Sequence, residues 1–289
     1  MAGMSLRRTI MKTANSVLAL AGLQLQRVQR DLDARVADPY LEHRLHQSLA
    51  APFREFLASQ ALFEAVDADW ELAIPEFYQA YLKSPFRGQA GGSRFNNLLW
   101  LYLIIRAYSP SVMVDVGTYK GASAWAMALG APGVPLYSFD IDLSNLKLRV
   151  PAKYIESDWK DFVFAEDISR GVCYFDDHVD QARRLLEAAA AGFPMVIFDD
   201  DFPLTSFAEM AHGGAALPKV EFVLDDRLRE QGEIAWLENG VRRSWTVDRA
   251  YLDRARSVIE ATARLPNTSL ITGIHQTPYR LVRLRSSAR

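Results

Sequence analysis

The stretch SVMVDVGTYKGAS, residues 111 to 123, combines a short apolar run with two glycines and decides the fold. The run ends at Val116, and Gly117 and Gly121 precede an apolar segment that begins near Ala122. A strand, a glycine turn and a helix in this order are typical of an open α/β sheet, in which ligands lie beyond the carboxyl ends of the strands. The glycines permit a tight turn, and the first amides of the helix can face a ligand.

Four more apolar runs of the same kind follow this stretch, and each is expected to be followed by a helical segment. They are PLYSFDID at 135–142, KYIESDW at 153–159, GVCYFDDH at 171–178 and PMVIFDDD at 194–201. Strands of this composition alternating with helices predict a parallel sheet covered on both faces, with the strand order 3-2-1-4-5. At the end of the chain only HQTP separates SLITGI (269–274) from YRLVRLR (279–285), so we expect an antiparallel hairpin there.

The remaining segments predict two additions to this sheet. Residues 1–92 carry apolar residues at helical spacing and form a predicted N-terminal helical segment, whereas 93–289 form the α/β domain. Within that domain, 208–266 is predicted to be an insert or lid that contains a hairpin around Asn239 and Gly240. The basic and apolar start of the chain resembles a signal peptide, but an amphipathic helix on the fold, a partner or a membrane surface is the favoured interpretation.

Composition limits the function classes. The 289 residues are 49% hydrophobic and 24% charged with a net charge of -2, and Cys173 is the only cysteine. Hence we expect a soluble cytoplasmic protein with no nucleic-acid partner, no disulfide and no thiolate metal cluster. No apolar run reaches the length of a membrane-spanning helix.

The glycine spacing and a following acid indicate the ligand. GxGxxG and GxxxxGK fit poorly because Gly117 and Gly121 are four residues apart and Lys120 precedes the second. Asp140 follows Gly117 by 23 residues, at the end of the neighbouring strand, where its carboxylate can accept hydrogen bonds from two ribose hydroxyls. We therefore expect a nucleoside ligand, with Asp158 near the base or serving as a strand-end cap.

These residues resemble the class I S-adenosylmethionine-dependent methyltransferases, and within them the metal-dependent O-methyltransferases of the catechol and of the macrocin and sugar type. The resemblance runs from about 86 to 202 and is clearest in RAYSPSVMVDVGTYKGASAWAMA, YSFDID, FDDHVD and IFDDDF. It implies a Rossmann-like, doubly wound, mostly parallel seven-stranded sheet with an antiparallel last strand. The implied cofactor is S-adenosyl-L-methionine, and the predicted cofactor-binding residues are Asp115, Gly117, Tyr119, Gly121, Ser123, Asp140 and Asp158.

Two acid clusters predict a divalent cation site. Asp177, Asp200 and Asp201 follow neighbouring predicted strands, and a set of oxygen ligands favours Mg²⁺. A register error of one residue would exchange Asp176 and Asp199 for these acids. Such an ion would bind two adjacent substrate oxygens and lower the pKa of one hydroxyl.

His178 and Asp180 are the candidates for the base that removes the proton. In the catechol type a lysine stands at the position of Asp180, whereas the macrocin and sugar type uses a nearby aspartate, so the resemblance favours a sugar-containing or natural-product acceptor. Arg183 and Arg184 are expected to be solvated, and His275 to lie on the surface. In the family, a loop like KSPFRGQAGGSRFN (83–96) contributes backbone contacts to the methionine part of the cofactor.

Other functions stay open at this point. A metal-independent methyltransferase would share the cofactor residues, a nucleotide-binding oxidoreductase would share the sheet and the ribose acid, and a non-catalytic relative would share the fold alone. The expected partner is a small molecule with hydroxyl groups. A homo-oligomer and peripheral membrane contact through the N-terminal helix are further expectations.

Overall fold

The computed structural model describes residues 38–66, 69–89, 91–203, 217–238 and 241–285. Contacts divide the chain into residues 1–30 and 31–289, and everything below concerns the second unit. The predicted amphipathic segment at the start of the chain lies outside the described residues. Among the helices that the structure describes, none has the length and apolar character needed to cross a membrane.

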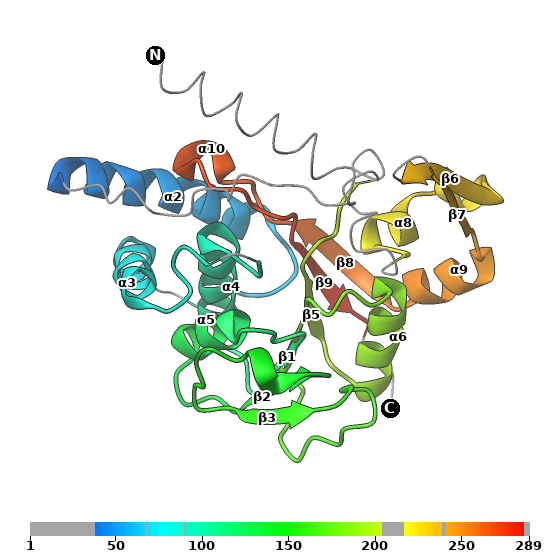
Figure 1. Cartoon of the computed structure of the whole chain (residues 1–289), viewed down its shortest axis with the longest axis horizontal. Coiled ribbons are helices and arrows are strands. Elements are labelled where there is room, and N and C mark those ends of the chain that lie inside the picture. Colours follow the sequence, from blue (N-terminus) through cyan, green and yellow to red (C-terminus); the bar gives the residue numbers. More distant parts are fainter. Residues whose placement is uncertain (1–37, 67–68, 90, 204–216, 239–240, 286–289) are drawn as a thin grey trace, which may run out of the picture. The chain divides into compact units, whose positions relative to one another are not determined.

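The main sheet is Rossmann-like and mostly parallel, as predicted. In the described part of the chain it has seven strands in the order β3-β2-β1-β4-β5-β9-β8 (Figure 1). The pairings of β5 with β9 (Arg280–Leu284) and of β9 with β8 (Ile259–Arg264) are antiparallel. The parallel strands are β1 (Met113–Val116), β2 (Leu136–Asp140), β3 (Lys153–Glu156), β4 (Val172–Phe175) and β5 (Met195–Phe198). The order reverses between β1 and β4, where open sheets of this kind bind ligands.

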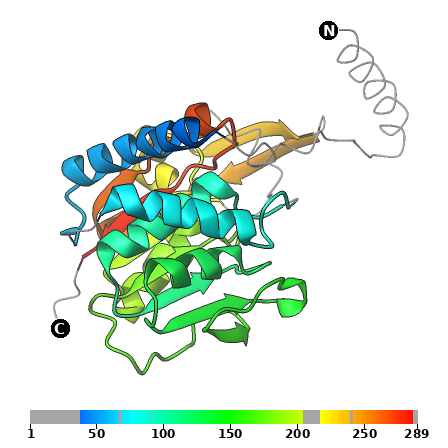
Figure 2. The ribbon, with the colours of Figure 1, turned by 90° about the vertical axis from the view of Figure 1, so that its left-hand side faces the viewer.

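Helices cover both faces of the sheet because successive strand residues point to opposite sides. Met113 packs in one apolar cluster with Leu103 of α4, whereas Val114 packs in a second cluster with Leu185 of α6. The first cluster includes residues of α2 (Pro39–Ser59), α3 (Trp70–Lys83), α4 (Phe95–Tyr108) and α5 (Ala122–Gly130), which lie in front of the sheet in Figure 2. The second includes residues of α6 (Gln181–Ala191), α8 (Val220–Leu224) and α9 (Arg249–Ser257).

The predicted helical segment 1–92 supplies helices to the first cluster. Its helices α2 and α3 belong to the unit that contains the sheet and share a cluster with α4. In α4 almost every residue is buried, and the helix ends at Ser109, whose φ of 52° is left-handed, directly before Pro110. Both features fit the apolar sequence and the helix stop that the sequence indicates.

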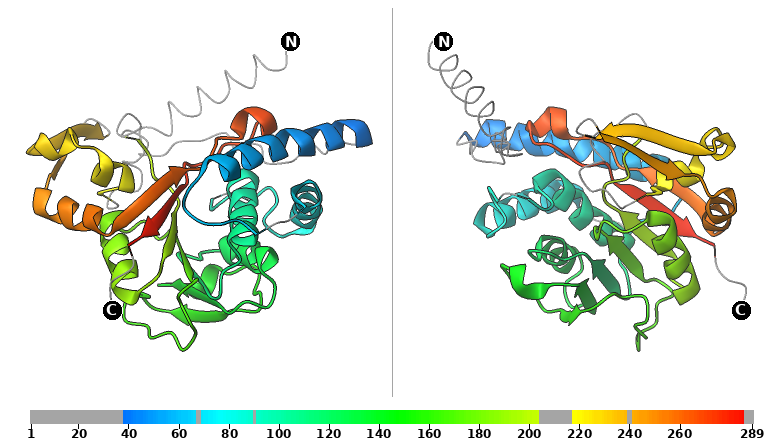
Figure 3. Two further views of the ribbon diagram at one scale, coloured as in Figure 1. Left: turned by 180° about the vertical axis from the view of Figure 1, so that it is seen from behind. Right: turned by 45° about the vertical axis from the view of Figure 1, so that its right-hand side comes forward.

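The terminal hairpin differs from the prediction. SLITGI does not form a strand: Ser269–Thr272 is the short helix α10, and the partner of β9 (Arg280–Leu284) is β8 (Ile259–Arg264) (Figure 3). Asn267 begins the helical turn by accepting a hydrogen bond from the backbone amide of Ser269 at 2.8 Å. The C-terminal part of the predicted insert 208–266 thus belongs to the sheet.

The other predicted hairpin is confirmed. The strands β6 (Glu233–Glu238) and β7 (Val241–Thr246) pair antiparallel and form a separate sheet (Figure 3). The predicted turn residues, 239 and 240, lie outside the described residues. Trp245 of β7 packs against Phe222 of α8 with ring centroids 5.9 Å apart, which joins this hairpin to the helices that cover the second face.

The turn after β1 yields a stability prediction. A Cβ at Gly117, where φ is 88°, would lie 2.6 Å from the carbonyl carbon and oxygen of Asp176, whereas one at Gly133, where φ is 82°, meets nothing within 4 Å. Alanine at either position suffers about 1 to 2 kcal/mol of left-handed strain. We expect Gly117→Ala to lose about 1 to 3 kcal/mol more through overpacking. Urea unfolding of both variants measures the difference, and equal losses would refute the close contact.

Candidate functional site

A cavity of about 490 Å³ opens at the carboxyl ends of the parallel strands. This volume lies within the range of small-molecule sites. Its walls come from the glycine turn after β1, from the ends of β2, β3 and β4, and from the loop before α4. Five of the predicted cofactor-binding residues line it: Gly117, Tyr119, Ser123, Asp140 and Asp158.

Asp140 at the end of β2 presents a carboxylate that is only partly used. Its Oδ2 accepts a hydrogen bond from the backbone amide of Tyr119 at 2.7 Å, and its Oδ1 accepts one from the amide of Asp142 at 3.1 Å. A carboxylate has about four acceptor positions. Each oxygen therefore keeps capacity for one further donor, such as one of two adjacent hydroxyls.

Asp115 and Gly121 have a different place from the other predicted residues, because neither is among those that line the cavity. Asp115 is fully buried in β1 and accepts a hydrogen bond from Ser138 Oγ at 3.0 Å. Burial raises the pKa of Asp115 to about 6, although hydroxyl groups of neighbouring residues partly offset it. A Cβ at Gly121 would lie 2.7 Å from the carbonyl oxygen of Leu148. Both residues therefore support the turn after β1 from outside the cavity.

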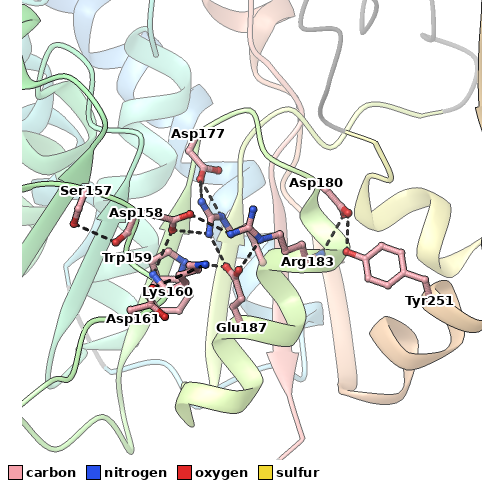
Figure 4. A network of polar contacts seen from close by, with 11 residues as sticks. Ser157, Asp158, Trp159, Lys160, Asp161, Asp177, Asp180, Arg183, Glu187 and Tyr251 are labelled. Atoms are coloured by element: carbon pink, nitrogen blue, oxygen red, sulfur yellow. Dashed lines mark hydrogen bonds and ion pairs between the residues drawn. The ribbon is translucent and has the colours of Figure 1, made fainter.

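Asp158 lines the cavity, but arginines occupy its carboxylate (Figure 4). Its Oδ1 lies 2.9 Å from Arg184 Nη1, and its Oδ2 lies 3.1 Å from Arg183 Nη2. Burial acts to raise the pKa of Asp158, but the hydrogen bond and charge of Arg184 outweigh it and lower the pKa. As predicted, Arg183 is partly solvated, with 41% of its side chain exposed, whereas the prediction for Arg184 is wrong, because 3% is exposed.

Three residues at the ends of β4 and β5 form a group that could hold a metal ion. One ligand atom from each of Asp176, His178 and Asp200 lies within 4.8 Å of the other two. His178 Nδ1 is 3.7 Å from Asp200 Oδ2. Burial, together with the charges of the neighbouring carboxylates, raises the pKa of Asp176 well above its usual range. A cation at this position would relieve that repulsion.

Two of the three predicted metal ligands have other partners. Asp177 forms an ion pair with Arg184 Nη2, and Asp201, which is fully buried, forms one with Arg280 Nε. The second oxygen of Asp201 accepts a hydrogen bond from the backbone amide of Glu221 at 2.8 Å. These contacts favour Asp176 in place of Asp177, the one-residue exchange left open by the sequence.

The two candidate bases also differ in position. Asp180 caps α6, with Oδ1 accepting from the amide of Arg183 at 3.1 Å and Oδ2 from the hydroxyl of Tyr251 at 2.6 Å (Figure 4). It is not among the residues that line the described cavities. His178 lines these cavities, and 61% of its side chain is exposed. This geometry favours His178.

A second cavity of about 180 Å³ adjoins the first and shares Gly92, Ser93, Asp176 and His178 with it. The described residues that line it are glycine or polar: Gly92, Ser93, Arg94, Asn97, Asp176, His178, Asp199, Asp200, His275 and Thr277. His275 is exposed, as predicted, but also belongs to this wall, which the sequence did not indicate. The group that could hold a metal ion thus lies where the two cavities meet.

Asp199 lies in the wall of the second cavity and is bonded to three neighbouring hydroxyl groups. Its carboxylate accepts hydrogen bonds from Tyr174 Oη at 3.1 Å, from Ser93 Oγ at 3.3 Å and from Thr277 Oγ1. Burial and the charge of Asp200 raise the pKa of Asp199 to about 7, against the opposing effect of the hydrogen bond from Thr277. Asp199 therefore joins the loop before α4 to the loop before β9 instead of facing a ligand.

Backbone strain is concentrated at this edge of the sheet. Tyr119, His178 and Asp200 are non-glycine residues with φ of 45°, 54° and 56°. Such conformations cost of order 1 to 3 kcal/mol each and tend to persist at functional sites. They turn the chain sharply after β1, β4 and β5, at the positions that border the cavities.

Comparisons with known proteins give no family assignment. No family model and no curated protein matches the chain. Among solved structures, it is similar to an O-methyltransferase from Bacillus cereus in complex with SAH, at 13% identity over 83% of this chain and 99% of that one, with a TM-score of 0.38. An SAH-bound methyltransferase from Podospora anserina is 13% identical over 88% and 100%, also with a TM-score of 0.38. These values are too low to support an argument about function, so the function is argued from the site.

Arg184 and Arg183 provide a matched stability test. Arg184 is buried against Asp158, Asp177 and Glu187, whereas the more exposed Arg183 contacts two of the same acids. Removing one partner of a buried ion pair typically costs about 3 to 5 kcal/mol, and an exposed pair contributes about 0 to 1 kcal/mol. We expect Arg184→Met to lose at least about 2 kcal/mol more than Arg183→Met in chemical unfolding. Similar losses would contradict the central role of Arg184.

The raised pKa of Asp115 predicts a pH dependence. Because the folded-state pKa is about 6 and the usual value is 3.8, this group stabilises the fold below about pH 4 and loses that contribution as pH rises through 6. The change is about 3 kcal/mol. We expect the free energy of unfolding of Asp115→Asn, relative to the native chain, to rise by this amount between pH 3 and 7. Parallel pH profiles of the two proteins would exclude this assignment.

Proposed function

We propose that this chain is an S-adenosylmethionine-dependent O-methyltransferase that uses a divalent cation and methylates a hydroxyl group of a sugar-containing or natural-product small molecule. The observation that carries the proposal is Asp140. Its carboxylate stands at the end of β2, beside the glycine turn, and faces the larger cavity with acceptor capacity left on both oxygens. A ribose, with two adjacent hydroxyls, matches this arrangement.

The rest of the larger cavity fits a nucleoside with an extension. Phe139, Ile141 and Ser157 line it on the β2 and β3 side of Asp140, where an apolar side chain and a hydroxyl can contact a base. Ile141 is 85% exposed, so a flat ring placed on it would bury apolar surface. On the other side, the cavity continues to Asp176 and His178, the residues that it shares with the second cavity. A group carried beyond the ribose would thus reach the boundary between them.

The donor set at this boundary suits a hard or borderline divalent cation. Two carboxylates, Asp176 and Asp200, favour Mg²⁺, for which Mn²⁺ can substitute. When bound, such an ion lowers the pKa of a coordinated hydroxyl and holds it in line with the methyl group. We assign Asp176 and Asp200 to the ion, which leaves His178 to accept the hydroxyl proton.

The polar second cavity favours an aliphatic polyhydroxylated acceptor. A catechol or other flat aromatic acceptor is usually held by apolar walls, and the described residues around this cavity are glycine or polar. Hydroxyl groups of a sugar can instead bond with polar groups of this wall such as the exposed imidazole of His275. With about 180 Å³, the cavity takes one such ring and leaves the remainder of the acceptor outside.

Titration calorimetry with S-adenosylhomocysteine tests the cofactor. We expect micromolar binding, and we expect Asp140→Ala to weaken it by about 1 to 3 kcal/mol because the ribose hydroxyls lose their acceptors. Asp142→Ala is the matched control, because this neighbouring acid is not among the residues that line the cavity. Asp200→Ala should leave cofactor affinity nearly unchanged while abolishing methyl transfer to a diol acceptor.

Two results would contradict this proposal. If the protein binds NAD but not S-adenosylhomocysteine, the oxidoreductase alternative is correct. If Asp140→Ala and Asp200→Ala reduce cofactor affinity alike, the division into a cofactor cavity and an acceptor cavity is wrong. Chelator treatment followed by Mg²⁺ or Mn²⁺ addition separates a metal-dependent enzyme, whose activity is lost and restored, from a metal-independent one.

A further inference from the structure

Gln89, in the loop before α4, has a buried amide without a partner. The residue is 7% exposed, and neither its Nε2 nor its Oε1 has a hydrogen-bond partner among the described residues. Leaving a buried polar group unpaired costs about 1 to 3 kcal/mol, and such groups in native proteins call for a specific explanation. Gln89 forms part of the wall of the larger cavity, so a ligand is one source of the missing partners.

The position of Gln89 identifies which part of a ligand it would meet. A Cβ at Gly92 would lie 3.8 Å from Gln89 Nε2 and 3.6 Å from the ring of Tyr119, so these three residues are neighbours over the glycine turn. Ser157 and Asp158 line the cavity from the end of β3, the base side of Asp140. Gln89 stands with Gly92 and Ser93, which extend to the second cavity. It therefore faces the ligand beyond the ribose.

The loop that carries Gln89 is anchored independently of any ligand. Ser93 Oγ donates to Asp199 Oδ2 at 3.3 Å and lies 3.3 Å from Tyr174 Oη. The backbone amide of Gln89, unlike its side-chain amide, donates to the carbonyl of Phe86 at 3.3 Å. The unpaired amide is therefore attached to a loop that is held on both sides. This anchoring lowers the entropic cost of using the amide in recognition.

We propose that Gln89 determines cofactor specificity by binding the amino-acid end of the cofactor with its side-chain amide, an inference that rests on the proposed function. That end carries an ammonium group and a carboxylate. A carboxamide has two donors and one acceptor, so it can pair with both charges at once. Gln89 thus selects the complete cofactor over nucleosides that lack the amino acid.

The test compares S-adenosylhomocysteine with 5′-methylthioadenosine, which keeps the adenosine and sulfur but has no amino-acid end. Calorimetry on the full chain would measure both ligands with the native protein, Gln89→Leu and Asp140→Asn. We expect Gln89→Leu to weaken the binding of S-adenosylhomocysteine at least about tenfold, because hydrogen bonds to charged groups are lost. It should change the affinity for 5′-methylthioadenosine by less than about twofold, because this ligand lacks the group that Gln89 binds. Asp140→Asn should weaken both ligands by a similar factor.

Ligand-free stability supplies a second readout. Because leucine removes unpaired polar atoms and keeps a similar volume, Gln89→Leu should melt at the same temperature as the native chain or higher. A lower melting temperature, or equal weakening of both ligands, would overturn the role of Gln89 while native binding of S-adenosylhomocysteine still upholds the proposed function. If the native protein binds neither ligand, both the proposed function and this inference fail.

Discussion

The accumulation of carboxylates at the carboxyl edge of the sheet is the constraint on which the site depends. Parallel strands end at the same edge, so acids that follow β4 and β5 are brought together whatever their distance in the sequence. Their mutual repulsion must then be offset by neighbouring positive groups or by protonation. Arginines contact Asp158, Asp177 and Asp201, whereas Asp200 lies beside the imidazole of His178. Burial and the charges of neighbouring acids raise the pKa of Asp176 and of Asp199.

This charge distribution divides the edge into a structural part and a part available to ligands. Arg184 and Arg280 are buried, and they form ion pairs with Asp177 and Asp201 respectively. Removing either arginine side chain would leave a buried carboxylate without its partner, at a cost of several kcal/mol. Asp140, Asp176, His178 and Asp200 line the cavities as well, but among the described residues no arginine pairs with these three acids. The same residue type therefore stabilises the fold at one position and remains open to a ligand at the next.

The sequence predicted the parts of this arrangement that are encoded locally. The five parallel strands, their order, the glycine turn and Asp140 follow from apolar runs that end in glycine or acid. The choice between Asp176 and Asp177 could not be predicted, because it depends on Arg184, a residue of the next helix that pairs with Asp177. The burial of Arg184 depends on Asp158, an acid 26 residues away. The strand β8 was missed because SLITGI, although apolar, forms the short helix α10, whose first backbone amide donates to the side chain of Asn267.

The loop before β9 shows why the error at β8 matters for the site. With β8 at 259–264 and β9 at 280–284, the chain between them is long enough to return over the carboxyl edge. Asn97 of α4 donates to Thr277 Oγ1 at 2.7 Å, and Asn96 donates to the carbonyl of Ile274 at 2.8 Å. These bonds hold His275 in the wall of the second cavity. A tight hairpin would lack this loop, so the antiparallel end of the sheet helps to build the cavity in which an acceptor would meet the cofactor.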